Sequence, residues 1–415
     1  MYASRWRIIL LLMGYAAVGQ FNRYAISVAG AEVFIPKFGI TEMQMGWVYS
    51  AFLIVYTIGM LPGGWLVDRF GSSRVLTWFG LTMGVFVVLT GALGWMATAA
   101  GSLLVGLLFI RGLAGGCSSP LHPGAAHVVS QVMTEPRRAT ANSMITAGAV
   151  IGIACCYPAF GWLMDRVTWQ WAFTLCGLAL LAYAIGWRLC VSPSLPRPQP
   201  TSQFEGTNVE AVRWLLRQRS LWLLTLSYAA FGYFQYLFFY WMSYYFKDVL
   251  GVSDVAARWA AFGIALAQGG GMILGGLSTD AVSKRLGAMQ GRRVVVMTGM
   301  GLAATFGVIA VNVSGLQNIA ACLAVSMGTL GMCDGIFWTT ATDVGGRSGG
   351  LSGAFMNTGG NIGGFIAPVL TPFLALSMGW SGAITVACVI SGIGGLLWFL
   401  ITPPAAVVEM PDAVS

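Results

Sequence analysis

Two arginines lie within long apolar runs of this sequence, where a charged side chain needs a specific reason to be present. Arg111 lies in the run LLVGLLFIRGLAGG, and Arg23 follows Gln20 and Asn22 in another run. An arginine at the centre of a membrane helix costs about 3 kcal/mol, and it usually faces a protein interior or a watery cavity. Its guanidinium could bind a carboxylate through two parallel charge-assisted hydrogen bonds. We therefore interpret both as candidate anion-binding residues. The alternative is structural arginines that bind backbone carbonyls or reach the membrane surface.

Two further polar groups in apolar runs could exchange a proton within a membrane. Asp334 lies in GMCDGIFW, and His122 lies in SSPLHPGAAH. Both side chains can change charge, and intramembrane ionisable residues often mark proton pathways. We favour Asp334 as the proton carrier; its alternative role is a fixed hydrogen-bond acceptor or a partner of one arginine. His127 is interpreted as structural, and Glu32 is expected to be hydrated at the outer mouth rather than in the site.

The composition predicts an integral membrane protein. Of 415 residues, 57% are hydrophobic and 9% are charged, whereas soluble domains have about a quarter charged residues. Apolar runs of about 20 residues fit helices that cross the bilayer, and barrel strands would show shorter alternating segments. The expected fold is therefore all-α. The net charge of +8 comes from basic residues in short loops between the runs, so a nucleic-acid partner is rejected.

Twelve apolar runs predict twelve transmembrane helices. We place them near 8–34, 43–66, 75–98, 101–127, 139–163, 170–191, 221–246, 256–278, 294–312, 317–340, 350–374 and 381–402. The domain prediction is an N-terminal six-helix bundle over 1–191, a cytoplasmic linker over 192–220, a C-terminal six-helix bundle over 221–403 and a cytoplasmic tail over 404–415. The linker contains PSLPRPQP followed by VEAVRWLLRQRS, so we expect it to end in an interfacial helix.

The basic residues predict the orientation. Sixteen of the 22 Lys and Arg residues lie on the side of the N-terminus, and four lie on the other side: Lys37, Arg166, Lys247 and Arg258. Loops rich in Lys and Arg stay in the cytoplasm. Both termini are therefore expected in the cytoplasm, with the chain in a bacterial inner membrane.

A glycine and charge pattern follows the second run and occurs again in the second half. The first copy is G-x-x-x-D-R-x-G-x-x-R, made by Gly64, Asp68, Arg69, Gly71 and Arg74. The second copy contains Gly276 and Asp280 at the same spacing. We expect Gly64 to permit close helix approach and Gly71 to turn the chain, and we interpret the pattern as a cytoplasmic latch that gates the protein.

Other positions support a duplication of six spans. Asp280 follows Asp68 by 212 residues, and Gly363 follows Gly152 by 211. The segment AGAVIGIACCYPAFGWL resembles TGGNIGGFIAPVLTPFL, each with glycines four apart and then a proline. Two parallel six-span halves with a site at their interface are typical of a rocking transporter.

Several stretches resemble the major facilitator superfamily, and in particular its anion:cation symporter branch. They are SAFLIVYTIGMLPGGWLVDRFG, the region around Arg111, TWQWAF, FWTTATD and GAFMNTGGNIGGFIAP, so the resemblance covers nearly all of the chain except the linker and tail. It implies transport of organic anions such as sugar acids and hexuronates, often with protons. By position, Arg23 and Arg111 match the family's two arginines. Asn22 and Ser118 replace its usual acids, which puts proton coupling in doubt.

The resemblance also implies a lining for the pocket. Sugar acids need hydroxyl, amide and aromatic groups beside the arginines. By position in the resembling motifs these groups are Tyr56, Trp338, Asn357 and Asn361, and the local sequence adds Gln20, Asn22 and Gln235. Ordinary packing between helices is the alternative for each. The aromatic run YAAFGYFQYLFFYWMSYYF is expected to be mainly core, and which of Tyr233, Gln235 and Tyr236 reaches the cavity is left open.

The leading hypothesis is uptake of a small organic anion by alternating access with proton symport. Two alternatives are an uncoupled facilitator or anion exchanger and a transporter-like membrane sensor. The loops carry no Ser/His/Asp set, metal-ligand cluster or phosphate-binding loop, so we expect no enzyme activity, no cofactor and no metal. The expected partners are the substrate anion, protons and lipid, and the protein is expected to be a monomer.

Overall fold

The computed structural model describes residues 2–96, 99–191 and 209–402, and within them the chain is helical with short connections. Most of the expected linker, residues 192–208, and the expected tail, 404–415, lie outside the described residues. The α-helices are α1 Tyr2–Ala29, α2 Ile35–Phe38, α3 Glu42–Phe70, α4 Ser72–Met96, α5 Ala100–Ser118, α6 Leu121–Val132, α7 Glu135–Arg166, α8 Trp169–Cys190, α9 Val209–Arg217, α10 Arg219–Tyr244, α11 Asp254–Leu286, α12 Ala288–Asn312, α13 Leu316–Gly331, α14 Asp334–Gly345 and α15 Gly349–Leu396.

These helices form the twelve expected spans. Nine segments of the described chain are long and apolar enough to cross a membrane. The segment from Gly349 holds two spans, because Gly379 breaks the helix with a φ of 72°. The remaining two spans are α1 and α10. The apolar run of α1 contains the polar residues Gln20, Asn22 and Arg23, and α10 is rich in Tyr and Trp. Polar and amphipathic residues lower the mean hydropathy of a window without shortening its helix.

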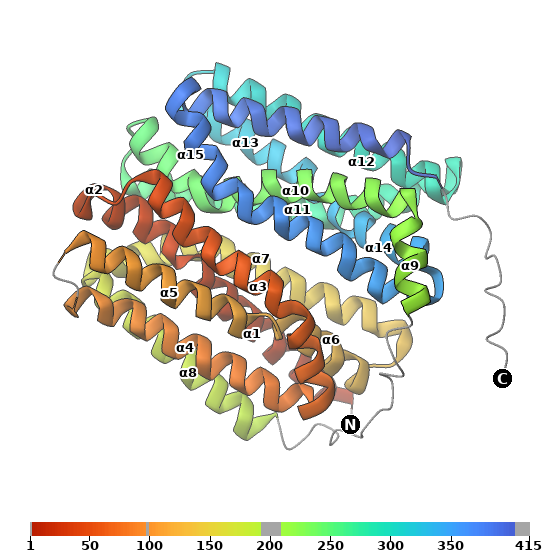
Figure 1. Ribbon diagram of the computed structural model, residues 1–415, viewed down its shortest axis with the longest axis horizontal. Helices are drawn as coiled ribbons and strands as arrows, with labels where there is room; N and C mark the ends of the chain where they lie inside the picture. The colour runs from red at the N-terminus through yellow and green to blue at the C-terminus, as the bar shows by residue number, and fades with distance from the viewer. Residues whose placement is uncertain (1, 97–98, 192–208, 403–415) are drawn as a thin grey trace.

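The helices form two groups that lie side by side in Figure 1. Helices α1 to α8 make the first half, and α10 to α15 make the second. The same pairings hold each half together: α1 packs on α7 as α10 packs on α15, and α3 packs on α5 as α11 packs on α13. The halves meet where α3 contacts α15 and where α7 contacts α11. The structure therefore confirms the two pseudo-symmetric six-helix bundles.

Glycines at equivalent positions allow these close pairings. A Cβ at Gly152 would lie 2.1 Å from the Ala17 carbonyl oxygen, and one at Gly363 would lie 2.0 Å from that of Ala229. Gly152 is on α7 and contacts α1, whereas Gly363 is on α15 and contacts α10. Any larger residue would separate the two backbones. The first helix of each half is thus fixed against the fifth by the same kind of contact.

One expectation for the repeated pattern is wrong. Gly64 and Gly276 have open space where a Cβ would be, so neither permits a close helix approach. The preceding glycines have this role: a Cβ at Gly63 would lie 2.8 Å from the Ser119 hydroxyl, and one at Gly275 would lie 2.1 Å from the Met332 carbonyl oxygen. The helical face that points at the neighbouring helix is therefore one residue earlier than the pattern indicated. Gly71 does turn the chain, with a φ of 84° after α3.

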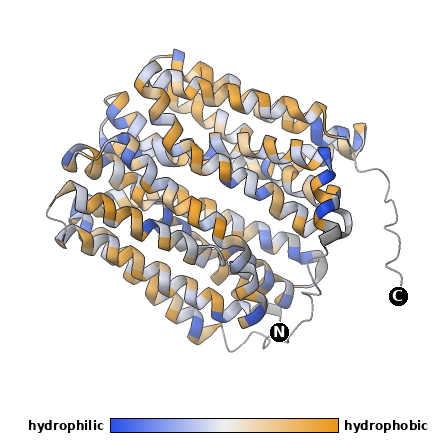
Figure 2. Ribbon diagram, in the orientation of Figure 1, coloured by the Kyte–Doolittle hydropathy of each residue, from blue (hydrophilic) through white to orange (hydrophobic). Residues whose placement is uncertain are grey.

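Because successive spans run in opposite directions, the connections between them lie at two ends of the molecule, and we call the end that holds the N-terminus the terminal end. The terminal end holds the start of α1 and the short helix α9, and the opposite end holds α2 (Figure 1). Lys37, Arg166, Lys247 and Arg258 are in segments at the opposite end, as the sequence predicted. Hydrophobic residues predominate along the long helices, and hydrophilic residues are prominent on α9 (Figure 2). The structure confirms a helix where the linker was expected to end.

The glycine contacts lead to a prediction about stability. Gly152→Ala places a methyl group against the backbone of α1, and overpacking of this kind costs about 1–3 kcal/mol. We expect a lower thermal midpoint for the purified protein in detergent. Gly186→Ala on α8 is the matched control, because no heavy atom lies within 4 Å of its Cβ position. Equal midpoints for the two variants would show that α1 and α7 are not held by this contact.

Candidate functional site

Arg23 lies in the centre of the interface between the two halves. Its side chain is surrounded by aromatic rings, with the guanidinium carbon 4.8 Å from the centre of Phe52 and 5.2 Å from that of Tyr56. Its Nη2 donates to the hydroxyl of Tyr236 at 3.2 Å, which joins α1 of the first half to α10 of the second. The residue is only 6% exposed, and its Nε has no hydrogen-bond partner. This is a buried cation held by ring faces and a neutral hydroxyl.

Arg111 contacts the same aromatic ring. Its guanidinium carbon lies 4.6 Å from the centre of Phe52, and its Nη2 donates to the backbone carbonyl of Arg23 at 3.0 Å. The residue is 4% exposed, and its Nε is also unpartnered. This hydrogen bond to a backbone carbonyl agrees with the alternative interpretation of Arg111, in which the arginine has a structural role. Neither Arg23 nor Arg111 makes an ion pair with any residue that the structure describes.

A small cavity lies beside Arg23. Its volume is about 10 Å³, close to the space of one water molecule, and Arg111 does not line it. The lining residues come from α1, α3, α4, α5 and α6: Gly19, Gln20, Arg23, Tyr56, Phe79, Ser118, Leu121 and His122. His122 is exposed as a residue, and it contributes to the lining of the cavity. The structure thus brings four predicted residues, Gln20, Arg23, Tyr56 and His122, to one small cavity.

Polar atoms at this site are incompletely paired. The Nε2 atoms of Gln20 and His122 are 3.4 Å apart, and the Oε1 of Gln20 is buried without a partner. Asn22 donates from Nδ2 to the Val18 carbonyl at 2.9 Å, and its Oδ1 is buried without a partner. A buried polar atom without a hydrogen-bond partner lowers the stability of the folded protein. A bound ligand or water molecule at this site could supply the missing partners.

The second half contributes two amides to the interface. Asn357 and Asn361 are both on α15, and their Nδ2 atoms lie 3.5 Å and 3.1 Å from the sulfur of Met60 on α3. A thioether is a weak acceptor, so both donors have capacity for a better partner. None of the predicted lining residues of the second half lines the cavity beside Arg23: the two amides contact Met60 instead, Trp338 is 40% exposed on α14, and Gln235 is half-buried on α10.

Asp334 lies apart from the arginines. It begins α14, and its Oδ1 accepts a hydrogen bond from the hydroxyl of Tyr228 at 3.1 Å. Tyr228 and Tyr236 are eight residues apart on α10, which corresponds to about 12 Å along the helix. The alternative that Asp334 pairs with an arginine is not observed, and a tyrosine hydroxyl is its partner.

The comparisons with known proteins agree with this architecture. The sequence profile described as Major Facilitator Superfamily matches residues 12–368, which is most of the chain. The chain belongs to the Major Facilitator Superfamily. The fold of this transporter is similar to that of a bacterial homologue of the human lysosomal transporter Spinster, solved in an inward-facing and unoccupied conformation. The TM-score is 0.77 at 17% identity, over 96% of each chain.

Relatives by sequence are transporters of sugar acids and other organic anions, not enzymes. A protein named probable galactarate/D-glucarate transporter from Bacillus subtilis (strain 168) is 27% identical over 71% of this chain and 69% of its own. One named probable sulfoacetate transporter from Cupriavidus necator is 27% identical over 82% of this chain and 79% of its own. A D-galactonate transporter of Escherichia coli is 30% identical over 44% of this chain and 40% of its own.

The repeated glycine and charge pattern lies at the terminal end of this superfamily member. The guanidinium of Arg69 lies 4.9 Å from the ring centre of Trp65, and Arg74 is exposed at the start of α4. Asp280 is exposed near the end of α11. The side chain of Asp68 lies outside the described residues. No contact of Arg69, Arg74 or Asp280 with the other half is seen among the described residues.

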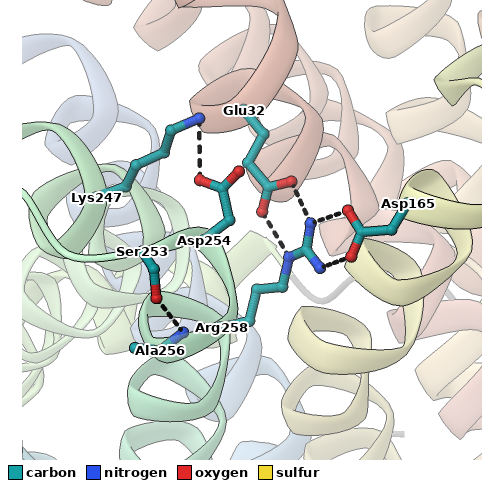
Figure 3. Close-up of polar contacts among 7 residues, drawn as sticks. All are labelled: Glu32, Asp165, Lys247, Ser253, Asp254, Ala256 and Arg258. Atoms are coloured by element: carbon teal, nitrogen blue, oxygen red, sulfur yellow. Dashed lines mark hydrogen bonds and ion pairs between the residues drawn. The ribbon is translucent and has the colours of Figure 1, made fainter.

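A second polar cluster joins the halves at the opposite end. We call Glu32, Asp165 and Arg258 the Arg258 cluster; Figure 3 shows both carboxylates directed at one guanidinium. The Nε and Nη2 of Arg258 donate to the two oxygens of Glu32 at 2.8 Å and 2.7 Å, and Nη2 also donates to Asp165 at 2.9 Å. Glu32 and Asp165 belong to the first half, whereas Arg258 belongs to α11. The expectation that Glu32 is hydrated is wrong, because Arg258 covers it and leaves 8% of its side chain exposed.

Several residues with evident contacts were missed by the sequence reasoning. Phe52 was not selected, although it precedes Tyr56 by four residues and therefore shares its helical face. Met60 is one further turn along the same face. Arg258 was placed at the outer end of the expected span 256–278 without a partner; it lies near the start of α11, where it packs against Gly161 of α7. Sequence spacing could have indicated Phe52, whereas the Arg258 cluster joins segments more than 90 residues apart.

The Arg258 cluster leads to a prediction about stability. Removal of one partner from a buried ion pair costs about 3–5 kcal/mol, because the remaining charge loses its partner. We expect Arg258→Ala to lower the thermal midpoint of the purified protein strongly. Asp165→Asn is the matched comparison and should have a smaller effect, because the Asp165 side chain is 52% exposed. A wild-type midpoint for Arg258→Ala would show that the cluster does not stabilise this arrangement of the halves.

Proposed function

We propose that the protein is a secondary active transporter that moves a small organic anion, such as a sugar acid, a hexuronate or a similar carboxylate. The observation that carries this proposal is Arg23: a buried cation that lines a small cavity between helices and makes no ion pair within the part of the chain that the structure describes. A guanidinium in this setting is well suited to a carboxylate, which it can bind through two hydrogen bonds. The relatives named for galactarate, glucarate, galactonate and sulfoacetate support an anionic cargo.

The proposed substrate site combines residues from both halves. Arg23, Tyr56, Gln20 and Asn22 would bind the anionic end, together with Arg111 behind Phe52. Asn357 and Asn361 would donate to substrate hydroxyls in place of the Met60 sulfur, and Trp338 and Gln235 remain proposed lining residues. The cavity holds about one water molecule, so a sugar acid requires the surrounding helices to separate.

We propose alternating access as the mechanism, with residues 1–191 and 221–403 as the two moving halves. Contacts at the opposite end support it, because they would have to open. The Arg258 cluster crosses the interface there, Ser50 donates to the Phe365 carbonyl at 2.6 Å, and Gly46 packs on the Pro368 carbonyl. The charge asymmetry of the loops supports an inner-membrane protein with both termini in the cytoplasm. The pattern of Gly64, Asp68, Arg69, Gly71, Arg74, Gly276 and Asp280 stays a proposed cytoplasmic latch.

We propose proton symport with Asp334 as the first candidate carrier and His122 as the second. The position of Asp334 supports this role, because the residue lies within the second half and its carboxylate accepts a hydrogen bond from a neutral group, the hydroxyl of Tyr228. The neutral residues Asn22 and Ser118 favour a different function, an uncoupled facilitator or anion exchanger. The two functions differ in whether the substrate carries protons with it.

A substitution at Arg23 tests the anion site. Arg23→Lys keeps the positive charge and removes the planar fork, so the affinity for a carboxylate should fall about tenfold or more. The measurement is the thermal shift of purified protein across a panel of sugar acids, in which a ligand stabilises by mass action. Arg166→Lys, exposed at the opposite end, is the control that should keep the shift. An unchanged shift in Arg23→Lys would remove Arg23 from the site.

A pH measurement in proteoliposomes tests proton coupling. Substrate influx through a symporter makes the external medium alkaline, and Asp334→Asn should abolish this change while substrate counterflow persists. Persistent alkalinisation in Asp334→Asn, lost in His122→Asn, would assign the carrier to His122. Counterflow by the wild-type protein without any alkalinisation would favour the facilitator or exchanger instead.

A further inference from the structure

Asp334 and His122 occupy equivalent positions in the duplicated unit. Asp334 follows His122 by 212 residues, which is also the interval between Asp68 and Asp280. Each lies where a span is broken, His122 at the second residue of α6 and Asp334 at the first residue of α14. Parallel repeats are related by an axis along the membrane normal, so equivalent residues lie at about the same depth. Asp334 is therefore level with the cavity that His122 lines.

A neutral hydroxyl group holds the carboxylate of Asp334. The Tyr228 hydroxyl on α10 donates to its Oδ1 at 3.1 Å, and Asp334 makes no ion pair with any residue that the structure describes. The other titratable neighbour is the thiol of Cys333, next to it in the chain. Of the helices that pack on α14, α15 carries no charged residue, and the charged residues of α11 lie in its first two and last two turns. A hydroxyl that donates to a carboxylate favours the charged form over the protonated acid.

The ring of Tyr228 is fixed by its neighbours. It stacks on Phe231 with ring centres 5.2 Å apart, and it lies 4.9 Å from the ring centre of Phe337. A Cβ at Gly360 of α15 would lie 2.6 Å from two carbons of the Tyr228 ring. One at Gly232 of α10 would lie 2.2 Å from the Gly360 carbonyl oxygen, so the two helix backbones touch here. A change in the position of the Tyr228 hydroxyl therefore requires movement of these rings or of α15.

The same part of α15 carries the two amides of the proposed cargo site. Asn361 follows Gly360 directly, and Asn357 precedes it by three residues. Both amides donate to the sulfur of Met60 on α3 of the first half. Helix α15 thus contacts Tyr228 through Gly360 and the first half through the amides. A cargo that draws the amides away from Met60 would shift the helix that packs on Tyr228.

We propose that Tyr228 is the positioning residue that couples protonation of Asp334 to the binding of cargo. This inference rests on the proposed function, in which Asp334 carries the proton. When Asp334 takes a proton from water, its carboxylate becomes a neutral acid, and the charge-assisted hydrogen bond from Tyr228 becomes an ordinary one. Tyr228 keeps its own proton. The ring and α15 then adopt the arrangement in which the amides bind cargo, and by reciprocity bound cargo favours the proton on Asp334.

Tyr228→Phe tests the proposal, because it keeps the ring and removes the hydroxyl. The charged carboxylate then loses about tenfold or more in stability relative to the acid, as one charge-assisted hydrogen bond provides. We expect the pH midpoint of D-glucarate affinity, measured by competition with substrate counterflow in proteoliposomes, to rise by about one unit. Tyr183→Phe is the matched control and should keep the wild-type midpoint, because its hydroxyl donates to the Leu11 carbonyl within the first half. A wild-type midpoint in folded Tyr228→Phe would overturn the proposal.

The same substitution in an Asp334→Asn background separates positioning from a structural effect. Without the acid, Tyr228→Phe should leave the remaining pH dependence unchanged, and a further shift there would overturn the proposal. Gly360→Ala is the second variant if Tyr228→Phe does not fold. Its methyl group would displace the ring from Asp334 and should also raise the midpoint, whereas Gly350→Ala, with open space at its Cβ position, should not.

Two results with the wild-type protein distinguish this proposal from the proposed function. D-glucarate affinity that does not change with pH would overturn the role of Tyr228 together with proton symport, and would leave anion transport intact. Absence of binding for every sugar acid in the panel would overturn the proposed function as well.

Discussion

The stacking of two buried guanidinium groups on Phe52 is the interaction on which the rest of the site depends. Phe52 is fully buried on α3, and its ring faces receive Arg23 from α1 and Arg111 from α5. A cation over an aromatic ring gains some of the stabilisation that it loses with its hydration, but far less than a carboxylate would provide. The protein thus keeps two cations in its interior at a cost. Under the proposed function, an anion that enters the site would recover part of that cost.

Duplication of a six-helix unit explains most of the architecture. The close contacts of Gly152 with α1 and of Gly363 with α10 are the same contact made twice, and so are those of Gly63 and Gly275. Each half is rigid where backbones touch in this way. Between the halves, α3, α7, α11 and α15 make most of the contacts, which include the close approach of Gly46 to the Pro368 carbonyl and the hydrogen bond from Ser50 to the Phe365 carbonyl. Under the proposed mechanism, these contacts would have to open while those within each half persist.

The sequence was sufficient for the fold because the bilayer imposes a simple rule on helix length and hydropathy. The twelve apolar runs correspond to twelve membrane spans, including α1, whose polar cluster lowers its mean hydropathy. The site was predictable only in part. Arg23, Gln20, Tyr56 and His122 do share a cavity, whereas Arg111 contacts Phe52 and does not line that cavity. Apolar runs show that a residue is within the membrane, but they do not show which way its side chain points.

Contacts that join distant segments were beyond sequence reasoning for the same reason. Glu32 has the sequence context of a hydrated acid, and only the approach of α11 to α7 places Arg258 over it. The prediction that Gly64 faces the neighbouring helix was wrong by one residue. One residue along a helix corresponds to a rotation of about 100°, so Gly64 points away from the helix that Gly63 contacts. Spacing of 211 or 212 residues identified the duplicated unit, yet it carried no information about how the two copies meet.

The hydrogen bond from Arg23 to Tyr236 gives one donor two competing uses. Arg23 also lines the cavity, where the proposed function would have its guanidinium bind a carboxylate. Rotation of the guanidinium toward an arriving anion would then weaken a tie across the interface. By thermodynamic reciprocity, whatever strengthens the tie must weaken the anion's affinity by the same factor. Under the proposed function, solute occupancy and the association of the two bundles would therefore be linked through the Arg23 guanidinium.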